Sequence, residues 1–362
     1  MSVPFHRLLL PLALLSMVSC SSVAYLGQAA KGQISLLLAR EPIDALLSEQ
    51  GIDAELRESL TLILELREFA ASELGLPVGS SYESYVQLDR DFVVWNVFAA
   101  PEFSVDALTW CYPIAGCVGY RGFFSEEAAQ ASARALEAQG FEVYVGGVSA
   151  YSTLGWFDDP VLSSMLARSD LQLASTLFHE LAHQVAYARG DTTFNESFAS
   201  VVEREAMARW LASRGESPRL TEFEQSAGRR DRFTRLVLDA RAELAELYSQ
   251  QPAPGSEALR SAKAELRESL RVEYAALKMT WQDFGGYDAW FAGPLNNAQL
   301  STIATYNGLV AEFECLLRQS EGELPDFFSR VSQLAKAGEL ASTRLLEATG
   351  EGRGCGAADG LF

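Results

Sequence analysis

Two histidines placed four positions apart are the feature that most restricts how this chain can fold. They lie in the sequence His179-Glu180-Leu181-Ala182-His183, within a segment, 170–188, that contains neither Gly nor Pro. Asp170 is a residue type that often caps helices, and Gly190 favours a helix end, so we predict one helix over 170–188. Residues four apart share a helical face, so both imidazoles can bind one metal ion while Glu180 addresses a water molecule beside it.

The third metal ligand has to come from another residue type. A catalytic zinc takes three protein ligands and leaves its fourth position to water. The chain has three histidines, and the remaining one, His6, lies in the N-terminal sorting signal described below. We therefore expect a carboxylate rather than a cysteine. Glu196 is the preferred ligand because it opens the next predicted helix, 195–213, and Glu203 on the same helix is the alternative. One Zn²⁺ per chain is expected.

The N-terminus resembles a bacterial lipoprotein signal. Residues 1–7 carry one positive charge, and 8–18 form an apolar run that is too short to span a bilayer stably. Small residues precede Cys20, which would carry the lipid after removal of residues 1–19. Ser21 follows instead of Asp, which is typical of lipoproteins sent to the outer membrane. We predict a lipid-anchored protein facing the periplasm; the alternative is an ordinary cleaved secretory signal.

Composition favours a packed globular protein and excludes one class of partner. The chain has 362 residues, of which 48% are hydrophobic and 21% charged, so we expect residues 20–362 to form a single domain. There are 48 acidic and 29 basic side chains, giving a net charge of -19. This charge repels phosphate backbones, and we therefore expect no nucleic-acid partner.

Four further cysteines suggest disulfides. An even number in an oxidising compartment usually pairs, although four cysteines allow three connectivities. Residues 112–116 are turn-forming and can bring Cys111 and Cys117 together, which leaves Cys315 for Cys355. No histidine lies near either pair, and this argues against a role in metal binding.

Hydrophobic periodicity predicts an α+β chain that is predominantly helical, with a small sheet before the metal-site helix and a helical bundle after it. We divide the chain into N-terminal helices (20–84), a β-rich part (85–160), the metal-site helices (161–215) and the C-terminal helices (216–362). The elements expected before the metal site are two helices within 30–76, strands within 85–124, a helix over 125–140, a strand over 141–157 and a helix opened by Asp159 and Pro160. Those expected after it are a hairpin of two long helices over 223–248 and 257–281, then helices over 296–318 and 324–348.

The sequence HELAHQ followed by NESFASVVE resembles the paired motifs of gluzincin aminopeptidases, in which an N-E-x-x-A helix supplies the third zinc ligand. The resemblance implies a gluzincin-like core with His179, His183 and Glu196 as ligands and Glu180 as general base. Thirteen positions separate His183 from Glu196, fewer than in thermolysin or its aminopeptidase relatives. Glu203, twenty positions after His183, fits the spacing of thermolysin better but lacks the N-E-x-x-A context.

A wider resemblance covers nearly the whole chain after the signal. Residues 25–33, 111–123 and 151–160, together with the metal motif, are similar to a family of aminopeptidases found as lipoproteins in Gram-negative bacteria. The family implies a zinc-dependent peptidase, with peptides as substrates and aminopeptidase as the favoured activity.

The resemblance also indicates which residue type stabilises the oxyanion of the transition state. Related enzymes use a Tyr or His for this purpose. Since no histidine is left over, a tyrosine is expected, and the candidates are Tyr151, Tyr187 and Tyr306.

Substrate binding is expected just before the metal-site helix, where gluzincins resemble one another in pairing an edge strand with an extended peptide. Residues 151–154 are the candidate strand, which makes Ser152 and Thr153 substrate-binding residues. Asp158 follows and can bind the free α-amino group of a substrate, the contact that would define an aminopeptidase.

Two other function classes compete with this interpretation. One is a zinc amidase or endopeptidase that acts on cell-wall or other peptides. The other is an assembly lipoprotein that keeps the metal for stability without turnover, but a purely structural site has no need of the base Glu180. The sequence carries no signal for the oligomeric state.

Overall fold

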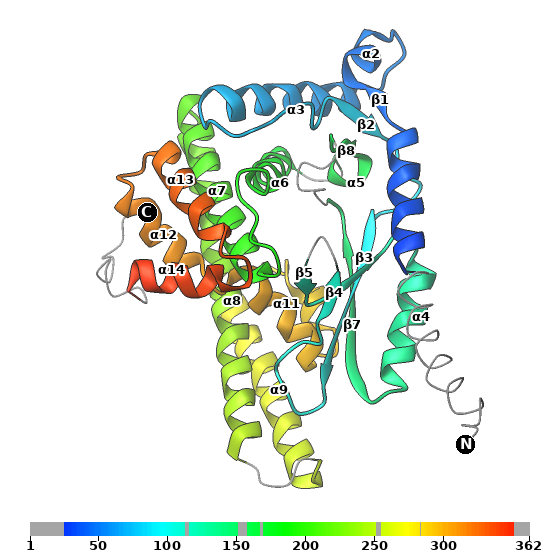
Figure 1. Ribbon diagram of the computed structural model, residues 1–362, viewed down its shortest axis with the longest axis vertical. Helices are drawn as coiled ribbons and strands as arrows, with labels where there is room; N and C mark the ends of the chain where they lie inside the picture. The colour runs from blue at the N-terminus through cyan, green and yellow to red at the C-terminus, as the bar shows by residue number, and fades with distance from the viewer. Residues whose placement is uncertain are drawn as a thin grey trace, which may run out of the picture.

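The computed structural model describes residues 25–112, 116–150, 158–166, 169–250, 255–282 and 284–350. Helices dominate, and they surround short strands that gather into small sheets (Figure 1). The predicted α+β class with a predominance of helix is therefore confirmed. In these ranges, no helix combines the length and apolarity that a bilayer crossing requires.

Three helices replace the two that were predicted before the sheet. They are a helix over 25–38, α2 (Ile43–Ser48) and α3 (Ala54–Ser72). Asp53 caps α3, because its side chain accepts hydrogen bonds from the backbone N–H groups of Glu55 and Leu56. The buried side chains of α3 recur every three or four residues and form one wall of the main core: Leu60, Ile63, Leu66 and Ala70.

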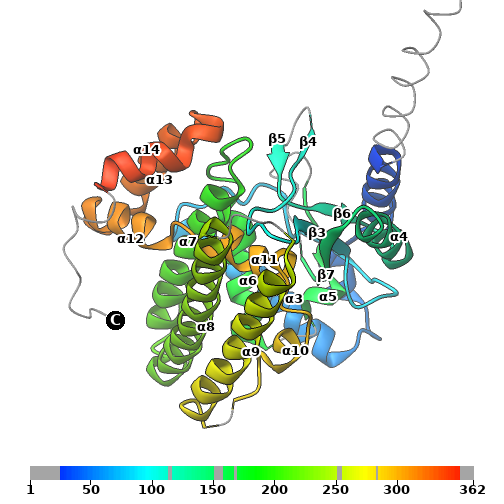
Figure 2. The ribbon, with the colours of Figure 1, turned by 90° about the horizontal axis from the view of Figure 1, so that it is seen from below.

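The strands form three small sheets among the described residues. One sheet has the order β1-β2-β8, the second β6-β3-β7, and the third is the hairpin β4-β5. Helix α4 (Glu126–Glu137) covers one face of the second sheet, and α11 (Asn297–Asn307) packs on the other (Figure 2). The strand bounds are Glu41–Pro42 (β1), Ser84–Val86 (β2), Val94–Pro101 (β3), Trp110–Tyr112 (β4), Gly116–Val118 (β5), Arg121–Phe123 (β6), Phe141–Val148 (β7) and Val161–Leu162 (β8).

The helix predicted to begin at Pro160 does not form there. Instead, β8 pairs in parallel with β2, and only the short helix α5 (Ser163–Leu166) follows. Asp159 is buried, and its backbone carbonyl accepts a hydrogen bond of 2.6 Å from the N–H of Tyr82. Tertiary pairing with β2 thus overrides the local signal for a helix cap.

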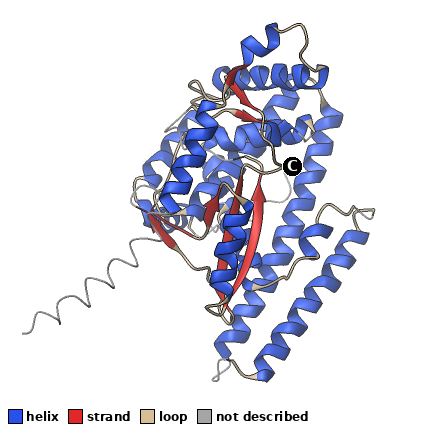
Figure 3. Cartoon of the chain, turned by 90° about the vertical axis from the view of Figure 1, so that its right-hand side faces the viewer, coloured by secondary structure: helices blue, strands red, loops and turns tan. Residues whose placement is uncertain are grey.

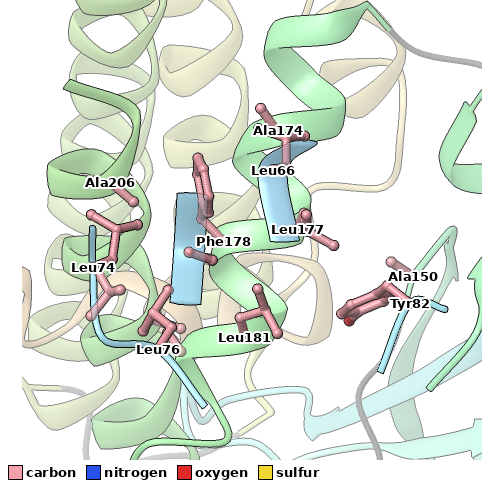
Figure 4. Close-up of a cluster of buried hydrophobic side chains, with 14 of the residues drawn as sticks. Leu66, Leu74, Leu76, Tyr82, Ala150, Ala174, Leu177, Phe178, Leu181 and Ala206 are labelled. Carbon is pink, nitrogen blue, oxygen red and sulfur yellow. The ribbon is translucent and has the colours of Figure 1, made fainter. Parts of the chain in front are cut away.

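The two metal-site helices, α6 (Asp170–Ala182) and α7 (Thr192–Ser213), lie side by side. Ser169 rather than Asp170 caps α6, in a reciprocal capping box with Gln172. The helix ends at Ala182, six residues earlier than predicted, and the chain turns before α7 begins. Figure 4 shows apolar side chains of α6 in the core with those of neighbouring segments: Leu177, Phe178 and Leu181 with Leu66, Leu74, Leu76 and Ala206.

The C-terminal part begins with the predicted hairpin of long helices, α8 (Ser217–Gln250) and α9 (Glu257–Met279), which extends from the body of the molecule (Figure 3). Each of the two later predicted helices is divided. Over 296–318, α11 ends at its C-cap Gly308, where a Cβ atom would lie only 2.8 Å from the side chain of Thr193. Over 324–348, Gly338 with φ of 58° interrupts the helix. The remaining elements are α10 (Asp288–Phe291), α12 (Val310–Gln319), α13 (Leu324–Ala335), the 3₁₀ turn η2 (Gly338–Leu340) and α14 (Ala341–Thr349).

The aromatic cluster that holds α7 against the C-terminal helices gives a first prediction. Phe198 is fully buried, and its ring packs against those of Phe313, Phe327 and Phe328. We expect Phe198→Ala to lower the free energy of unfolding by about 3–5 kcal/mol, because it leaves a cavity in a close-packed core. Urea denaturation measures this change. Met279→Ala, at a side chain that is 78% exposed, is the control and should change it by less than about 0.5 kcal/mol. Equal effects of the two variants would contradict the assigned core.

Candidate metal centre

The two faces of α6 point into different surroundings. Its apolar residues, among them Leu177, Phe178 and Leu181, are buried in the main core. Its polar residues alternate with these at helical spacing and line a cavity of about 630 Å³: Gln172, Ser175, Thr176, His179 and Glu180. The sequence pattern of α6 therefore aims the residues that carry chemistry at an accessible space, since successive helical residues rotate by about 100°.

Three side chains that could hold a metal ion meet at the end of α6. His179 lies in its last turn, His183 is its C-cap, and Glu196 comes from the first turns of α7. Glu196 Oε2 lies 3.3 Å from His179 Nε2 and 3.7 Å from His183 Nε2. One donor atom from each of the three residues lies within 4.8 Å of the others.

This donor set fits a single metal ion. Two imidazole nitrogens and one carboxylate oxygen are ligands that zinc and similar divalent ions accept. Donors around a tetrahedral zinc are about 3.4 Å apart, and the distances from Glu196 Oε2 to the two imidazole nitrogens, 3.3 and 3.7 Å, are close to this value. Within the described residues, Nδ1 of His183 is buried and has no hydrogen-bond partner.

The connection between the helices places Glu196. Asn195 is buried, and its side chain makes two hydrogen bonds to the backbone of Ala188, accepting from N–H at 2.7 Å and donating to C=O at 2.9 Å. Asp191 caps α7 by accepting from the N–H of Phe194, and its other oxygen accepts from the N–H of Ser342. The start of α7 is thereby fixed to the preceding turn, with Glu196 directed back to the histidines.

Glu203 contacts the other side of His179. Its Oε2 lies 3.3 Å from Nδ1 of His179, the ring nitrogen that faces away from Glu196 and His183. Its Oε1 accepts hydrogen bonds from Ser175 Oγ and, at 2.9 Å, from Arg230 of α8. A carboxylate can only accept, so it selects the tautomer with hydrogen on Nδ1 and leaves Nε2 for a metal. Glu203 therefore orients the candidate ligand His179. The third residue of the candidate ligand group is Glu196 and not the alternative, Glu203.

Burial and neighbouring charges shift the two imidazoles in opposite directions. Burial, together with the nearby His179, lowers the pKa of His183 to about 4, so that ring is neutral and keeps a lone pair for coordination. Burial also opposes the charge of His179, but hydrogen bonds to Glu196 and Glu203 raise its pKa to about 10, so a metal ion that binds Nε2 has to displace a proton from this ring. Burial alone would raise the pKa of Glu196, yet His183 and His179 hold it below its usual range.

Glu180 is the acidic side chain on α6 that faces the cavity beside the ligands. Burial raises its pKa to about 7, an effect that the carboxylates of Glu196 and Asp159 reinforce and His179 opposes. A carboxyl group in this range can both accept and release a proton near neutral pH. The arrangement suits general acid and base chemistry on a molecule bound in the cavity.

The structure describes the side chain of one of the three tyrosines predicted to stabilise the oxyanion. Tyr151 lies outside the described residues, and Tyr306 belongs to α11 with a side chain that is likewise outside the description. Tyr187 is half-buried in the turn after α6; burial and the charge of Glu196 raise its pKa. A residue that the sequence did not single out, Tyr120, responds to the same charge, because burial and Glu196 raise its pKa.

Of the three predicted substrate-binding residues, the structure describes Asp158, which does not line the cavity beside the candidate metal ligands. Ser152 and Thr153 lie outside the described residues. Asp158 is exposed and lines a separate hollow with Arg40. The cavity beside the metal group is instead bordered by the end of β7, at Gly147 and Val148.

One of the two expected disulfides lies within the described residues. A disulfide joins Cys111 and Cys117 across the β4-β5 hairpin. Cys315 is buried in α12, whereas Cys355 and the lipidation candidate Cys20 lie outside the described residues.

Sequence reasoning missed several residues that support the site. Ser175 lies one turn before His179 on the same face of α6, a spacing that could have marked it. Asn195 was part of the recognised motif but received no role of its own. Arg230 lies on the long hairpin, for which the sequence indicated no role in the site, and only the tertiary fold places it next to Glu203.

The contact between Glu203 and His179 gives a second prediction. We expect Glu203→Gln to weaken metal binding by about 10- to 100-fold, because the amide no longer fixes the His179 tautomer with a full charge. Titration with Zn²⁺ in competition with a chromophoric chelator measures the affinity. Glu205→Gln, on the same helix but paired with Arg209, is the matched control and should leave the affinity unchanged. If both variants bind Zn²⁺ like the parent protein, Glu203 has no such role.

Comparison with known proteins places this site within a family. The family described as "Putative aminopeptidase" matches residues 24–346. No curated protein and no solved structure matches the sequence. The match spans most of the chain and includes the ligand group of His179, His183 and Glu196. The chain therefore belongs to the "Putative aminopeptidase" family.

Proposed function

We propose that the protein is a zinc-dependent aminopeptidase with a gluzincin-like core. The observation that carries the proposal is the convergence of His179, His183 and Glu196 within 4.8 Å, beside a cavity that Glu180 faces. A volume of about 630 Å³ lies within the range of about 300–1,000 Å³ that small-molecule sites occupy. Membership of the "Putative aminopeptidase" family supports peptide bonds as the target.

The chemistry would be divided between the metal and the chain. Zinc bound by the three ligands would supply an acidified water molecule and polarise the peptide carbonyl. Glu180 accepts the proton of the attacking water and passes it to the leaving amine, a task that its raised pKa of about 7 suits. Glu203, held by Ser175 and Arg230, keeps His179 in the correct orientation.

The oxyanion is assigned to a phenol rather than to a histidine. Tyr187 and Tyr120 are the described candidates, since burial raises the pKa of both and Glu196 adds to the effect in each case. A neutral phenol is a hydrogen-bond donor, which is what a developing oxyanion requires. Tyr151 and Tyr306 stay as candidates from the sequence.

The end of β7 is the proposed place for the substrate backbone. In the described residues β7 pairs with β3 alone, so its other edge is unpaired, and Gly147 and Val148 border the cavity. An extended peptide can add to such an edge through main-chain hydrogen bonds. Residues 151–154, the strand expected from the sequence, are proposed to continue this contact.

We also propose that residues 20–362 act as one peptidase domain that a lipid on Cys20 holds at the outer membrane, facing the periplasm. Support comes from the signal-like residues 1–19 and from the disulfide between Cys111 and Cys117, which suits an oxidising compartment. The contact of Arg230 from the long hairpin with Glu203 supports the single domain.

Replacing the proposed base separates metal binding from turnover. We expect Glu180→Gln to retain about one zinc per chain, yet to slow peptide hydrolysis by about 10²- to 10⁴-fold because the amide cannot accept a proton. Glu196→Ala should lose both metal and activity. Elemental analysis and initial rates on amino-acid arylamides measure the two properties. Parent-like rates for Glu180→Gln would remove this residue as the base, and metal-free parent protein would refute the zinc proposal.

A pair of substrates tests the specificity. We expect hydrolysis of a short peptide to fall by at least about tenfold when its N-terminus is acetylated, because acetylation removes the charged amine that an aminopeptidase binds. Product analysis by mass spectrometry gives both the rate and the bond that is cleaved. Equal rates, or cleavage within the peptide, would favour an endopeptidase or another amidase instead.

A further inference from the structure

The N-terminal helix over 25–38 is fixed to the β-rich part by one face. The ring of Tyr25 stacks on Tyr112 with centroids 5.3 Å apart, and the guanidinium of Arg121 lies 4.2 Å from its centre. Gln28 donates a hydrogen bond of 3.2 Å to the carbonyl of Gly122. These contacts settle which side of the helix faces the protein.

The opposite side is apolar and exposed. Leu26 is 47% exposed, Ile34 is 55% exposed and Leu38 is 83% exposed, and the intervening Ala30 is exposed as well. Positions 26, 30, 34 and 38 recur every four residues and form a continuous stripe, called here the outer face. A helix on the surface of a water-soluble protein normally turns charged and polar side chains outward. Three large aliphatic side chains in one stripe are therefore a costly exposure to water.

The charge of this segment differs from that of the rest of the chain. Residues 20–40 contain Lys31 and Arg40 and no Asp or Glu, whereas the whole chain has a net charge of -19. Lys31 is exposed next to the outer face. An apolar stripe beside an exposed cation, in a segment without acidic side chains, suits a helix that lies in the interface of a lipid bilayer, where cations meet anionic headgroups.

We propose that the outer face of the helix over 25–38 rests in the headgroup region of the membrane. The proposal rests on the lipid anchor proposed above, which explains why a bilayer is the occupant. Cys20 precedes Tyr25 by five positions, and five extended residues reach at most about 18 Å. A lipid on Cys20 would therefore keep the outer face within reach of the surface. The helix lies at the rim of the molecule near α4 (Figures 1 and 2).

An environment-sensitive fluorophore on the outer face tests this contact. Full-length Ile34→Cys protein, purified from expressing cells, is labelled with a thiol-reactive NBD dye and reconstituted into phosphatidylethanolamine vesicles containing phosphatidylglycerol. Met279→Cys, at a side chain that is 78% exposed on α9, is the matched control, and labelled parent protein gives the background. We expect a blue-shifted emission at position 34 that quenchers carried by the lipid reduce and aqueous iodide does not. The label at position 279 should show the reverse.

Three results would overturn the proposal. Emission at position 34 that matches position 279 would place the outer face in water. Protection from both quenchers would mean that a protein, or a second copy of this chain, covers it. Adding Leu38→Glu to the protein labelled at position 34 should abolish quenching by the lipid-borne quenchers. Unchanged quenching would show that the outer face does not make the membrane contact. The anchor is judged separately, by acylation of the protein in the membrane fraction, so its failure is distinguishable from that of the helix contact.

Discussion

The candidate metal centre depends on the division of α6 between the apolar core and the cavity. Leu177, Phe178 and Leu181 are in the core against α3 and α7, while His179 and Glu180 point to the cavity. Because neighbouring helical residues differ in direction by about 100°, a rotation by one residue would exchange an apolar for a charged side chain. Burying an unpaired charge costs several kcal/mol, so the packed core allows only one orientation. The imidazoles are therefore aimed before a metal binds.

Charged side chains contact one another from the candidate ligands outward to the long hairpin. Glu196 and Glu203 lie about two turns apart on one face of α7 and flank His179 from opposite sides. A second buried carboxylate so close to the first is unfavourable unless a cation compensates it. Arg230 does so: burial would raise the pKa of Glu203, but Arg230 and His179 hold it well below its usual range. The long hairpin thus contributes directly to the site, through one residue of α8.

The motif could be predicted from sequence because its residues lie close together in the chain and on one helical face. Spacing indicated His179 and His183, while the resemblance to an N-E-x-x-A helix favoured Glu196 over Glu203, and the three residues do meet in the structure. What could not be predicted depends on contacts between distant segments. The residues after Pro160 pair with β2 as a strand instead of forming the predicted helix. Arg230 contacts Glu203 from a helix that is distant in the sequence. Local sequence patterns predict helices and strands. Which strands pair, and which cation neutralises a buried carboxylate, depends on the tertiary fold.

The short separation of thirteen positions between His183 and Glu196 also has a local cause. Helix α6 ends at Ala182 instead of continuing to 188, so the chain can reverse without a long connection. The reversal is held by Asn195, whose amide satisfies both backbone groups of Ala188. Buried backbone groups that are left unpaired are costly, so this double hydrogen bond stabilises the tight turn. The asparagine of the N-E-x-x-A motif therefore determines where its neighbour, Glu196, can reach.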